Sequence, residues 1–185
     1  MDASNQLRMM VYAALFAALT AVGAFLSVPI GPVPIVLQNM FVYLAGLLLG
    51  SRWGLASVGT YLLVGAVGLP VFAGGLGGIG RLVGPTGGYL LGYLPTVFLI
   101  GKIARTEAPQ MMTDVLAMIC GTLVLYACGV TWLKIVSDMP LGKTLALGMY
   151  PFLIGDAIKI AAAAAIARAL RPVIRVPGSA SRVAG

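Results

Sequence analysis

Charged side chains are scarce in this sequence, and histidine is absent. Only 9% of the 185 residues are Asp, Glu, Lys or Arg, whereas 60% are hydrophobic, and the mean hydropathy is +1.02. Soluble domains average about 25% charged residues, which cover their surfaces with polar groups. This composition therefore excludes a water-soluble fold and indicates an integral membrane protein.

The missing residue types also exclude several kinds of enzyme. Zinc proteases and Ser-His-Asp hydrolases both need histidine, and five acidic residues leave little for a pair of catalytic carboxylates. Gly142-Lys143-Thr144 resembles the end of a phosphate-binding loop, but Ser137 stands where that motif requires its first glycine. We therefore expect no catalysis and no ATPase site in this chain, and no bound cofactor or metal.

Long apolar runs make up most of the chain, without the alternation of apolar and polar residues that a transmembrane β-barrel requires. Because a helical span needs about 20 apolar residues, the length suits one domain, residues 1–185, of six helices. The predicted fold is an all-α membrane protein. Its predicted spans are Met9–Val28, Val33–Gly50, Trp53–Leu69, Gly87–Ile103, Met111–Trp132 and Leu145–Leu170.

A segment rich in glycine and proline separates the third and fourth predicted spans, over residues 70–86. Irregular backbone at membrane depth is tolerated where it is buried in protein or lines a cavity. This segment is thus either an extracellular loop across the mouth of a binding cavity or a plain connector. Its single charged residue, Arg81, either lines that mouth or is an ordinary exposed loop residue.

The basic residues indicate the orientation of the chain in the membrane. If both termini are cytoplasmic, eight basic residues lie inside and three outside, in agreement with the positive-inside rule. The eight are Arg8, Arg52, Lys102, Arg105, Arg168, Arg171, Arg175 and Arg182, and the three are Arg81, Lys134 and Lys143. No basic face remains for nucleic acid, and the expected surroundings are the lipids of a bacterial inner membrane.

The strongest local anomaly is a pair of charges within the last apolar run. Asp156 and Lys159 are three residues apart, so they share one helical face, in the outer half of the membrane on this orientation. An ionised group within a span costs about 2.5–3.5 kcal/mol even on the lenient insertion scale, and it needs a partner or a polar cavity. The pair therefore either lines a binding cavity or is an ion pair that holds helices together.

Other polar residues are predicted near the same outer side. Gln38 and Asn39 follow a proline-rich turn and are suited either to binding a ligand or to bonding another helix. Tyr89 lies in the outer part of the fourth predicted span, where a tyrosine is usually an interfacial anchor.

Small residues recur every fourth position on the first predicted span. Ala13 and Ala17 form one such pair, and Ala14 and Ala18 form another. Because helices in lipid associate through close backbone contact between small residues, this side is a candidate surface for a partner helix.

Several motifs together resemble the BioY family, over nearly the whole chain and in the expected order. They are Pro32–Asn39 (PVPIVLQN), Gly68–Gly75 (GLPVFAGG), Gly84–Leu90 (GPTGGYL), and Tyr150-Pro151-Phe152 with Gly155-Asp156 and Lys159. BioY proteins are substrate-binding (S) components of energy-coupling factor biotin transporters. The resemblance implies a six-helix subunit that captures biotin from outside and works with a transmembrane coupling protein and two ATPase subunits.

The resemblance also implies roles for particular residues. It makes Asp156 and Lys159 the main biotin-binding residues. Less specific matches are Arg81, Tyr89, Gln38 and Asn39, with Phe72, Gly74 and Gly75 of the glycine-rich loop. It assigns an A-x-x-x-A docking surface for the coupling protein to the first span, in the register of either alanine pair. Two other hypotheses remain: a structural membrane protein with a purely structural Asp–Lys pair, and an S component for another small vitamin.

Overall fold

The computed structural model, which describes residues 3–29, 31–104 and 110–174, confirms the predicted all-α membrane fold. Its helices are α1 (Ala3–Phe25), α2 (Gln38–Ala66), α3 (Ile79–Val83), α4 (Gly87–Ile103), α5 (Met111–Ser137), α6 (Leu141–Gly148) and α7 (Leu153–Leu170). A short antiparallel pair, β1 (Ser27–Val28) and β2 (Ile35–Val36), joins α1 to α2, and the 3-10 turn η1 (Tyr150–Phe152) precedes α7. Among the described residues, three helices, α1, α2 and α5, are long and apolar enough to cross a membrane.

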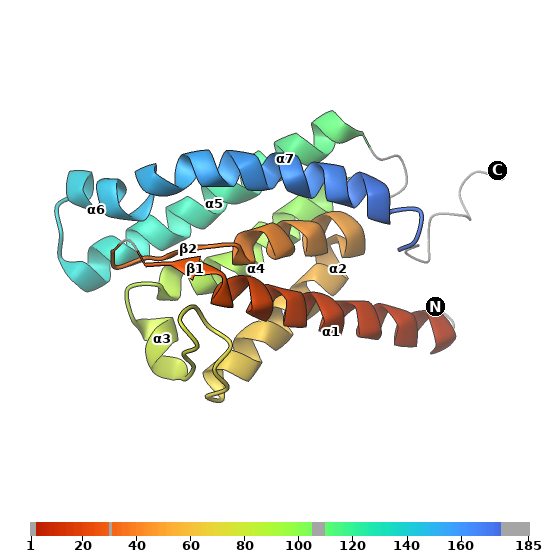
Figure 1. Ribbon diagram of the computed structural model, residues 1–185, viewed down its shortest axis with the longest axis horizontal. Coiled ribbons are helices and arrows are strands. Elements are labelled where there is room, and N and C mark those ends of the chain that lie inside the picture. The colour runs from red at the N-terminus through yellow and green to blue at the C-terminus, as the bar shows by residue number, and fades with distance from the viewer. Residues whose placement is uncertain (1–2, 30, 105–109, 175–185) are drawn as a thin grey trace.

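Helix α2 is two helices in space, because the chain turns back at Gly50. This residue has φ 75° and ψ −179°, a backbone conformation essentially restricted to glycine. A Cβ atom at Gly54 would lie 3.4 Å from the carbonyl oxygen of Ala45, which is possible only if the two parts lie side by side. The two parts correspond to the second and third predicted spans, and Figure 1 shows them running in different directions.

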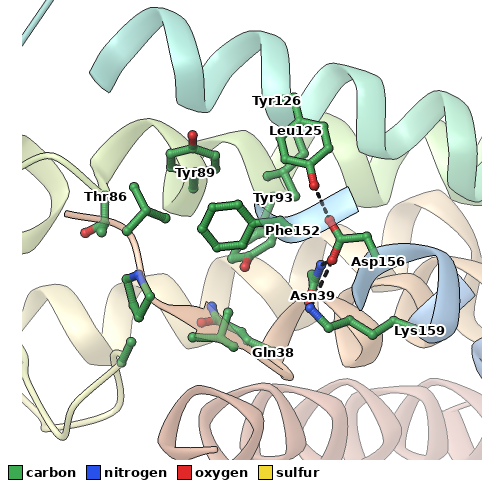
Figure 2. Close-up of a pocket in the computed structure, with 14 residues that line it drawn as sticks. Gln38, Asn39, Thr86, Tyr89, Tyr93, Leu125, Tyr126, Phe152, Asp156 and Lys159 are labelled. Atoms are coloured by element: carbon green, nitrogen blue, oxygen red, sulfur yellow. Dashed lines mark hydrogen bonds and ion pairs between the residues drawn. The ribbon is translucent and has the colours of Figure 1, made fainter. Parts of the chain in front are cut away.

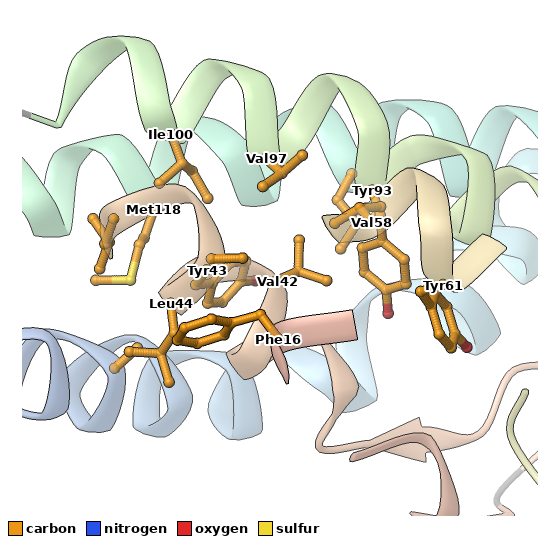
Figure 3. Close-up of a cluster of buried hydrophobic side chains, with 14 of the residues drawn as sticks. Phe16, Val42, Tyr43, Leu44, Val58, Tyr61, Tyr93, Val97, Ile100 and Met118 are labelled. Atoms are coloured by element: carbon orange, nitrogen blue, oxygen red, sulfur yellow. The ribbon is translucent and has the colours of Figure 1, made fainter. Parts of the chain in front are cut away.

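The helices pack in a bundle in which neighbours in the chain are mostly neighbours in space. Helix α2 contacts α1, α4 and α7, and α5 contacts α4, α6 and α7. Figure 1 shows the beginning of α1 and the end of α7 at one end of the bundle, with the β1–β2 pair, α3 and α6 at the other. Large buried side chains fill the interior, including Phe16, Val42, Tyr43, Val97 and Met118 (Figure 3).

Glycines let these helices approach closely. A Cβ atom at Gly46 would lie 2.8 Å from the side chain of Ile100, and one at Gly88 would lie 2.2 Å from that of Trp132. Apolar side chains on the outside remain uncovered, among them Leu15 of α1, which is 51% exposed. Apolar faces of this kind are suited to lipid, where association depends on packing rather than on the exclusion of water.

Two predicted spans have different bounds in the structure. The second helix begins at Gln38, whereas the sequence predicted Val33, because β2 and two prolines occupy the residues before it. The predicted last span, Leu145–Leu170, is interrupted, since α6 ends at Gly148 and α7 begins at Leu153. Proline at position 151 has no N–H to continue the α6 hydrogen-bond ladder, so the chain bends there into η1.

Other bounds differ as well. Helix α1 spans Ala3–Phe25, whereas the prediction was Met9–Val28, because residues 27 and 28 pair with β2. Helix α5 continues to Ser137, five residues beyond the predicted end at Trp132. Helix α4 has the predicted bounds. The glycine-rich segment holds a short helix, α3, that was not predicted.

The turn in α2 makes a first prediction. Gly50→Ala should lower the unfolding free energy by about 1–3 kcal/mol, because an L-residue is strained at this φ and ψ. The measurement is thermal unfolding in detergent. Gly59→Ala is the matched control, since Gly59 lies inside the same helix and an added Cβ meets nothing within 4 Å. Equal melting temperatures for the two variants would contradict the strained turn.

Candidate ligand-binding site

A cavity lies among the first turns of α2, α4 and α7, next to the middle of α5. It encloses about 510 Å³ of space that protein atoms do not fill, including open space at its mouth. Its lining is mainly apolar and aromatic, with a few polar groups. The lining residues are Val33, Pro34, Val36, Gln38, Asn39, Ala73, Thr86, Tyr89, Tyr93, Leu125, Tyr126, Phe152, Asp156 and Lys159.

The carboxylate of Asp156 accepts three hydrogen bonds, more than any other polar group in this lining. Its Oδ1 accepts hydrogen bonds from Asn39 Nδ2 at 2.7 Å and from Lys159 Nζ at 2.9 Å, and its Oδ2 accepts one from the Tyr126 hydroxyl at 2.5 Å. Asp156 is 4% exposed and Lys159 8% exposed. Donors from α2, α5 and α7 thus converge on one buried charge (Figure 2), which offsets the cost of removing it from water.

A chain of hydrogen bonds continues from this carboxylate into the core. The Thr122 hydroxyl donates to the carbonyl of Met118 at 2.8 Å, so the Tyr43 hydroxyl is the donor in its 2.7 Å contact with Thr122. Asn39 Nδ2 in turn lies 3.5 Å from the Tyr43 oxygen. The chain joins the α5 backbone to Asp156 through Tyr43 and Asn39, and it holds the Asn39 amide in one orientation.

Aromatic residues form much of the rest of the wall. The Tyr89 hydroxyl donates to the carbonyl of Gly148 at 2.6 Å, which joins α4 to the end of α6. In Figure 2, Thr86 and Tyr89 lie at one end of the view and the Asp156–Lys159 pair at the other, with Phe152 between them. A cavity with aromatic walls and one charged end is suited to a ligand that has an apolar ring and polar groups.

A second cavity adjoins the first, and the two share Pro34, Ala73 and Thr86 in their linings. It encloses about 770 Å³, again including open space, and Arg81 contributes its charge. The first cavity holds a carboxylate and an ammonium that pair with each other, whereas the guanidinium of Arg81 has no ion pair among the described residues. The second cavity therefore offers a positive group to an acidic ligand.

The structure brings most of the predicted site residues together. Asp156, Lys159, Gln38, Asn39 and Tyr89 all line the first cavity.

The predicted loop residues are placed differently. Arg81 and Gly74 line the second cavity instead, and Gly75 appears in neither lining. Phe72, expected with Tyr89 over a ligand ring, is absent from the first lining too. It packs edge-on against Tyr61, with ring centroids 5.5 Å apart, and fills the space left by Gly65.

Three aromatic lining residues, Tyr126, Tyr93 and Phe152, were not predicted from the sequence. Tyr126 lies 30 positions before Asp156, within a uniformly apolar run, so local spacing carried no sign of their hydrogen bond. Phe152 was noted only within a family motif. An aromatic side chain among aliphatic ones in a membrane helix is ordinarily a packing residue, and only the packing of α5 against α7 gives Tyr126 its site position.

The chain is similar to known proteins over most of its length. Residues 1–176 match the profile of the BioY family. This chain belongs to the BioY family. It is 44% identical to "Biotin transporter BioY" of Thermotoga maritima over 167 residues, which cover 89% of this chain and 96% of the relative. It is 43% identical to a "Probable biotin transporter BioY" of Pyrococcus horikoshii over 158 residues, 85% of this chain and 93% of the relative.

A solved structure has a similar fold. The crystal structure of "the S-component for biotin from an ECF-type ABC transporter" superposes on this BioY-family chain with a TM-score of 0.86 and 36% identity. The match covers 93% of this chain and 95% of the solved chain. The BioY relatives are named as transporters, so the expectation that the chain is not an enzyme is in line with its family.

A buried contact at the Tyr89 wall makes a second prediction. In Gly129→Ala the new Cβ atom would lie 2.2 Å from the Tyr89 ring, so the ring must move and the unfolding free energy should fall by about 1–3 kcal/mol. Helix propensity alone favours alanine by about 1 kcal/mol. Thermal unfolding measures the change, with Gly142→Ala, whose added Cβ meets nothing within 4 Å, as control. An unchanged or raised melting temperature in Gly129→Ala would contradict the contact.

Proposed function

We propose that this chain is the biotin-binding subunit of a bacterial vitamin uptake transporter and presents biotin to an ATP-driven coupling module. The observation that carries the proposal is the Asp156–Lys159 pair, which lines a cavity with aromatic walls instead of lying wholly within a helix contact. Membership of a family whose relatives are named biotin transporters supports it. No cofactor is expected to take part.

The chemistry of biotin suits the first cavity. Its ureido ring has two N–H donors and one strong acceptor, and its thiophane ring is apolar. Asp156 Oδ2 holds a single hydrogen bond and is able to accept a ureido N–H, while Lys159 retains hydrogens for the ureido oxygen. Hydrogen bonds to charged groups contribute about 1.5–3 kcal/mol each, enough to discriminate against analogues that lack the ureido group.

The valerate chain of biotin suits the second cavity. The two cavities adjoin at Pro34, Ala73 and Thr86, so a ligand whose ring lies beside Asp156 can extend its tail past these residues. Its carboxylate then lies on the side of Arg81, whose guanidinium is the favoured partner for a carboxylate. This placement gives Arg81 the mouth-lining role.

The proposed orientation places both termini in the cytoplasm of a bacterial inner membrane. The beginning of α1 and the end of α7 lie at one end of the bundle, which is consistent with an even number of crossings. The cavity is formed by the opposite ends of the helices and would then face outwards. Of the basic residues used to predict this orientation, Arg105, Arg175 and Arg182 lie outside the described residues.

The proposed partners are a transmembrane coupling protein and two ATP-binding cassette subunits. Ala13 and Ala17 are 6% and 7% exposed and pack in the core of this chain, so they have no surface for a partner. Ala14 and Ala18 are exposed on the outer face of α1. The docking surface therefore has the register of Ala14 and Ala18.

Biotin titration into the purified chain tests the binding role. Asp156→Asn and Lys159→Ala should raise the calorimetric Kd for biotin at least tenfold, because each removes one partner of a charge-assisted hydrogen bond. Both variants should keep a cooperative unfolding transition, since two donors remain on residue 156 in each case.

Asp114→Asn is the matched control, because Asp114 is buried and forms the other described ion pair, with Arg171 at 2.6 Å and 2.8 Å. It should lower stability and leave the Kd unchanged. Unchanged affinity in folded Asp156 and Lys159 variants would remove these residues from the site. If the Asp156–Lys159 pair had a purely structural role, exchanging the two charges would restore the stability that a single substitution removes.

The docking register makes a separate prediction. Ala14→Leu with Ala18→Leu should abolish co-purification with the coupling protein, because the larger side chains prevent close helix contact, and should leave biotin binding intact. Ala161→Leu with Ala165→Leu is the matched control: these alanines have the same spacing and are exposed on α7. If only the α7 double variant loses the complex, the coupling protein contacts α7 and not α1, which would contradict this proposal.

A further inference from the structure

Two amide atoms in the first cavity have no hydrogen-bond partner among the described residues. They are Gln38 Nε2, a donor, and Asn39 Oδ1, an acceptor. Both side chains line the cavity, and they are only 2% and 5% exposed. Buried polar atoms in folded proteins almost always have a partner, so two unpaired atoms of opposite kind beside one cavity point to a ligand that supplies both.

The orientation of the Asn39 amide follows from its other contacts. Its nitrogen donates to the Asp156 carboxylate at 2.7 Å and faces the Tyr43 oxygen at 3.5 Å. Turning the amide over would bring its oxygen against a carboxylate oxygen, and that contact is repulsive. The Asn39 oxygen is therefore held as an acceptor, ready for an N–H group of a ligand.

The Gln38 amide nitrogen is similarly available as a donor. Its polar neighbour is the Tyr61 hydroxyl, which already donates to the carbonyl of Val71 at 3.2 Å. The Gln38 nitrogen carries two hydrogens, and this hydroxyl can accept only one of them, so a hydrogen stays free for a ligand. A carbonyl oxygen on a ligand would provide the partner that the protein lacks.

We propose that Gln38 and Asn39 determine specificity by recognising the two sides of a cyclic urea. Gln38 Nε2 donates to the ring carbonyl, Asn39 Oδ1 accepts from one ring N–H, and Asp156 Oδ2 accepts from the other. The carboxylate has room for this bond, because three donors occupy three of its roughly four acceptor positions. The inference rests on the proposed function and assigns an atom of the protein to each polar atom of the ureido ring.

This arrangement predicts which analogues the site rejects. In 2-iminobiotin, a protonated cyclic guanidine, the ring carbonyl is replaced by a donor, which faces the Gln38 donor. In biotin methylated at a ring nitrogen, one N–H is lost and its acceptor on the protein stays unpaired. A site built to pair with each polar atom discriminates strongly against such analogues.

The experiment compares Kd values of the purified chain for biotin and 2-iminobiotin by calorimetry. The wild-type chain should prefer biotin, and Gln38→Met should reduce that preference about tenfold, mainly through weaker binding of biotin. Gln38→Glu, the same size as glutamine, should shift the preference further towards 2-iminobiotin by pairing with its positive charge. Gln6→Met, an exposed change on α1, is the matched control and should alter neither Kd.

Asn39→Ala tests the other amide. It should weaken the binding of biotin. It should also reduce, by about tenfold, the loss of affinity on methylation of the ring nitrogen that pairs with Asn39, because the variant removes the acceptor that the methylated nitrogen cannot satisfy. A purely structural role for Asn39 would weaken both ligands equally.

The outcomes separate this inference from the proposed function. Tight biotin binding by wild type, with unchanged preference between ligands in the Gln38 and Asn39 variants, would overturn the inference and leave the proposed function standing. An absence of biotin binding by the folded wild-type chain would overturn both.

Discussion

The negative charge of a carboxylate inside a membrane protein has to be compensated by other groups of the protein. The structure around Asp156 depends on this constraint. Water is absent from the hydrocarbon region, so each unpaired polar group there is costly. Asn39 from α2, Tyr126 from α5 and Lys159 from α7 provide the compensation. The positions of three helices are thereby linked to one charge, and the polar end of the cavity is organised before a ligand arrives.

The two described ion pairs, each with a buried carboxylate, show how similar chemistry serves different purposes. Asp114 and Arg171 form a bidentate pair between the start of α5 and the end of α7, and neither residue appears in the lining of the described cavities. Asp156 and Lys159, near the start of α7, face a cavity with unpaired amide atoms beside them. The first pair closes a helix contact, whereas the second leaves polar groups available for binding.

Much of the site was predictable because its signals are local. Gln38, Asn39, Asp156 and Lys159 are polar residues in apolar surroundings, where each needs a reason to be present, and all four line one cavity. Tyr126 carried no such signal, since a tyrosine is ordinary in an apolar helix. The alanine pairs of α1 have equal spacing, so composition did not distinguish them, whereas the tertiary structure buries Ala13 and Ala17 and leaves Ala14 and Ala18 exposed.

The sequence by itself determined the membrane environment, the helical class, the approximate spans and the charged pair in the last helix, because hydropathy, breakers and spacing are local properties of a chain. Tertiary structure alone decided which residues meet. Asn39 and Asp156 are 117 positions apart, and their hydrogen bond exists because the turn at Gly50 and the packing of α2 on α7 bring them together. Long-range contacts of this kind set the orientation of the Asn39 amide, and with it the pattern of donors and acceptors offered to a ligand.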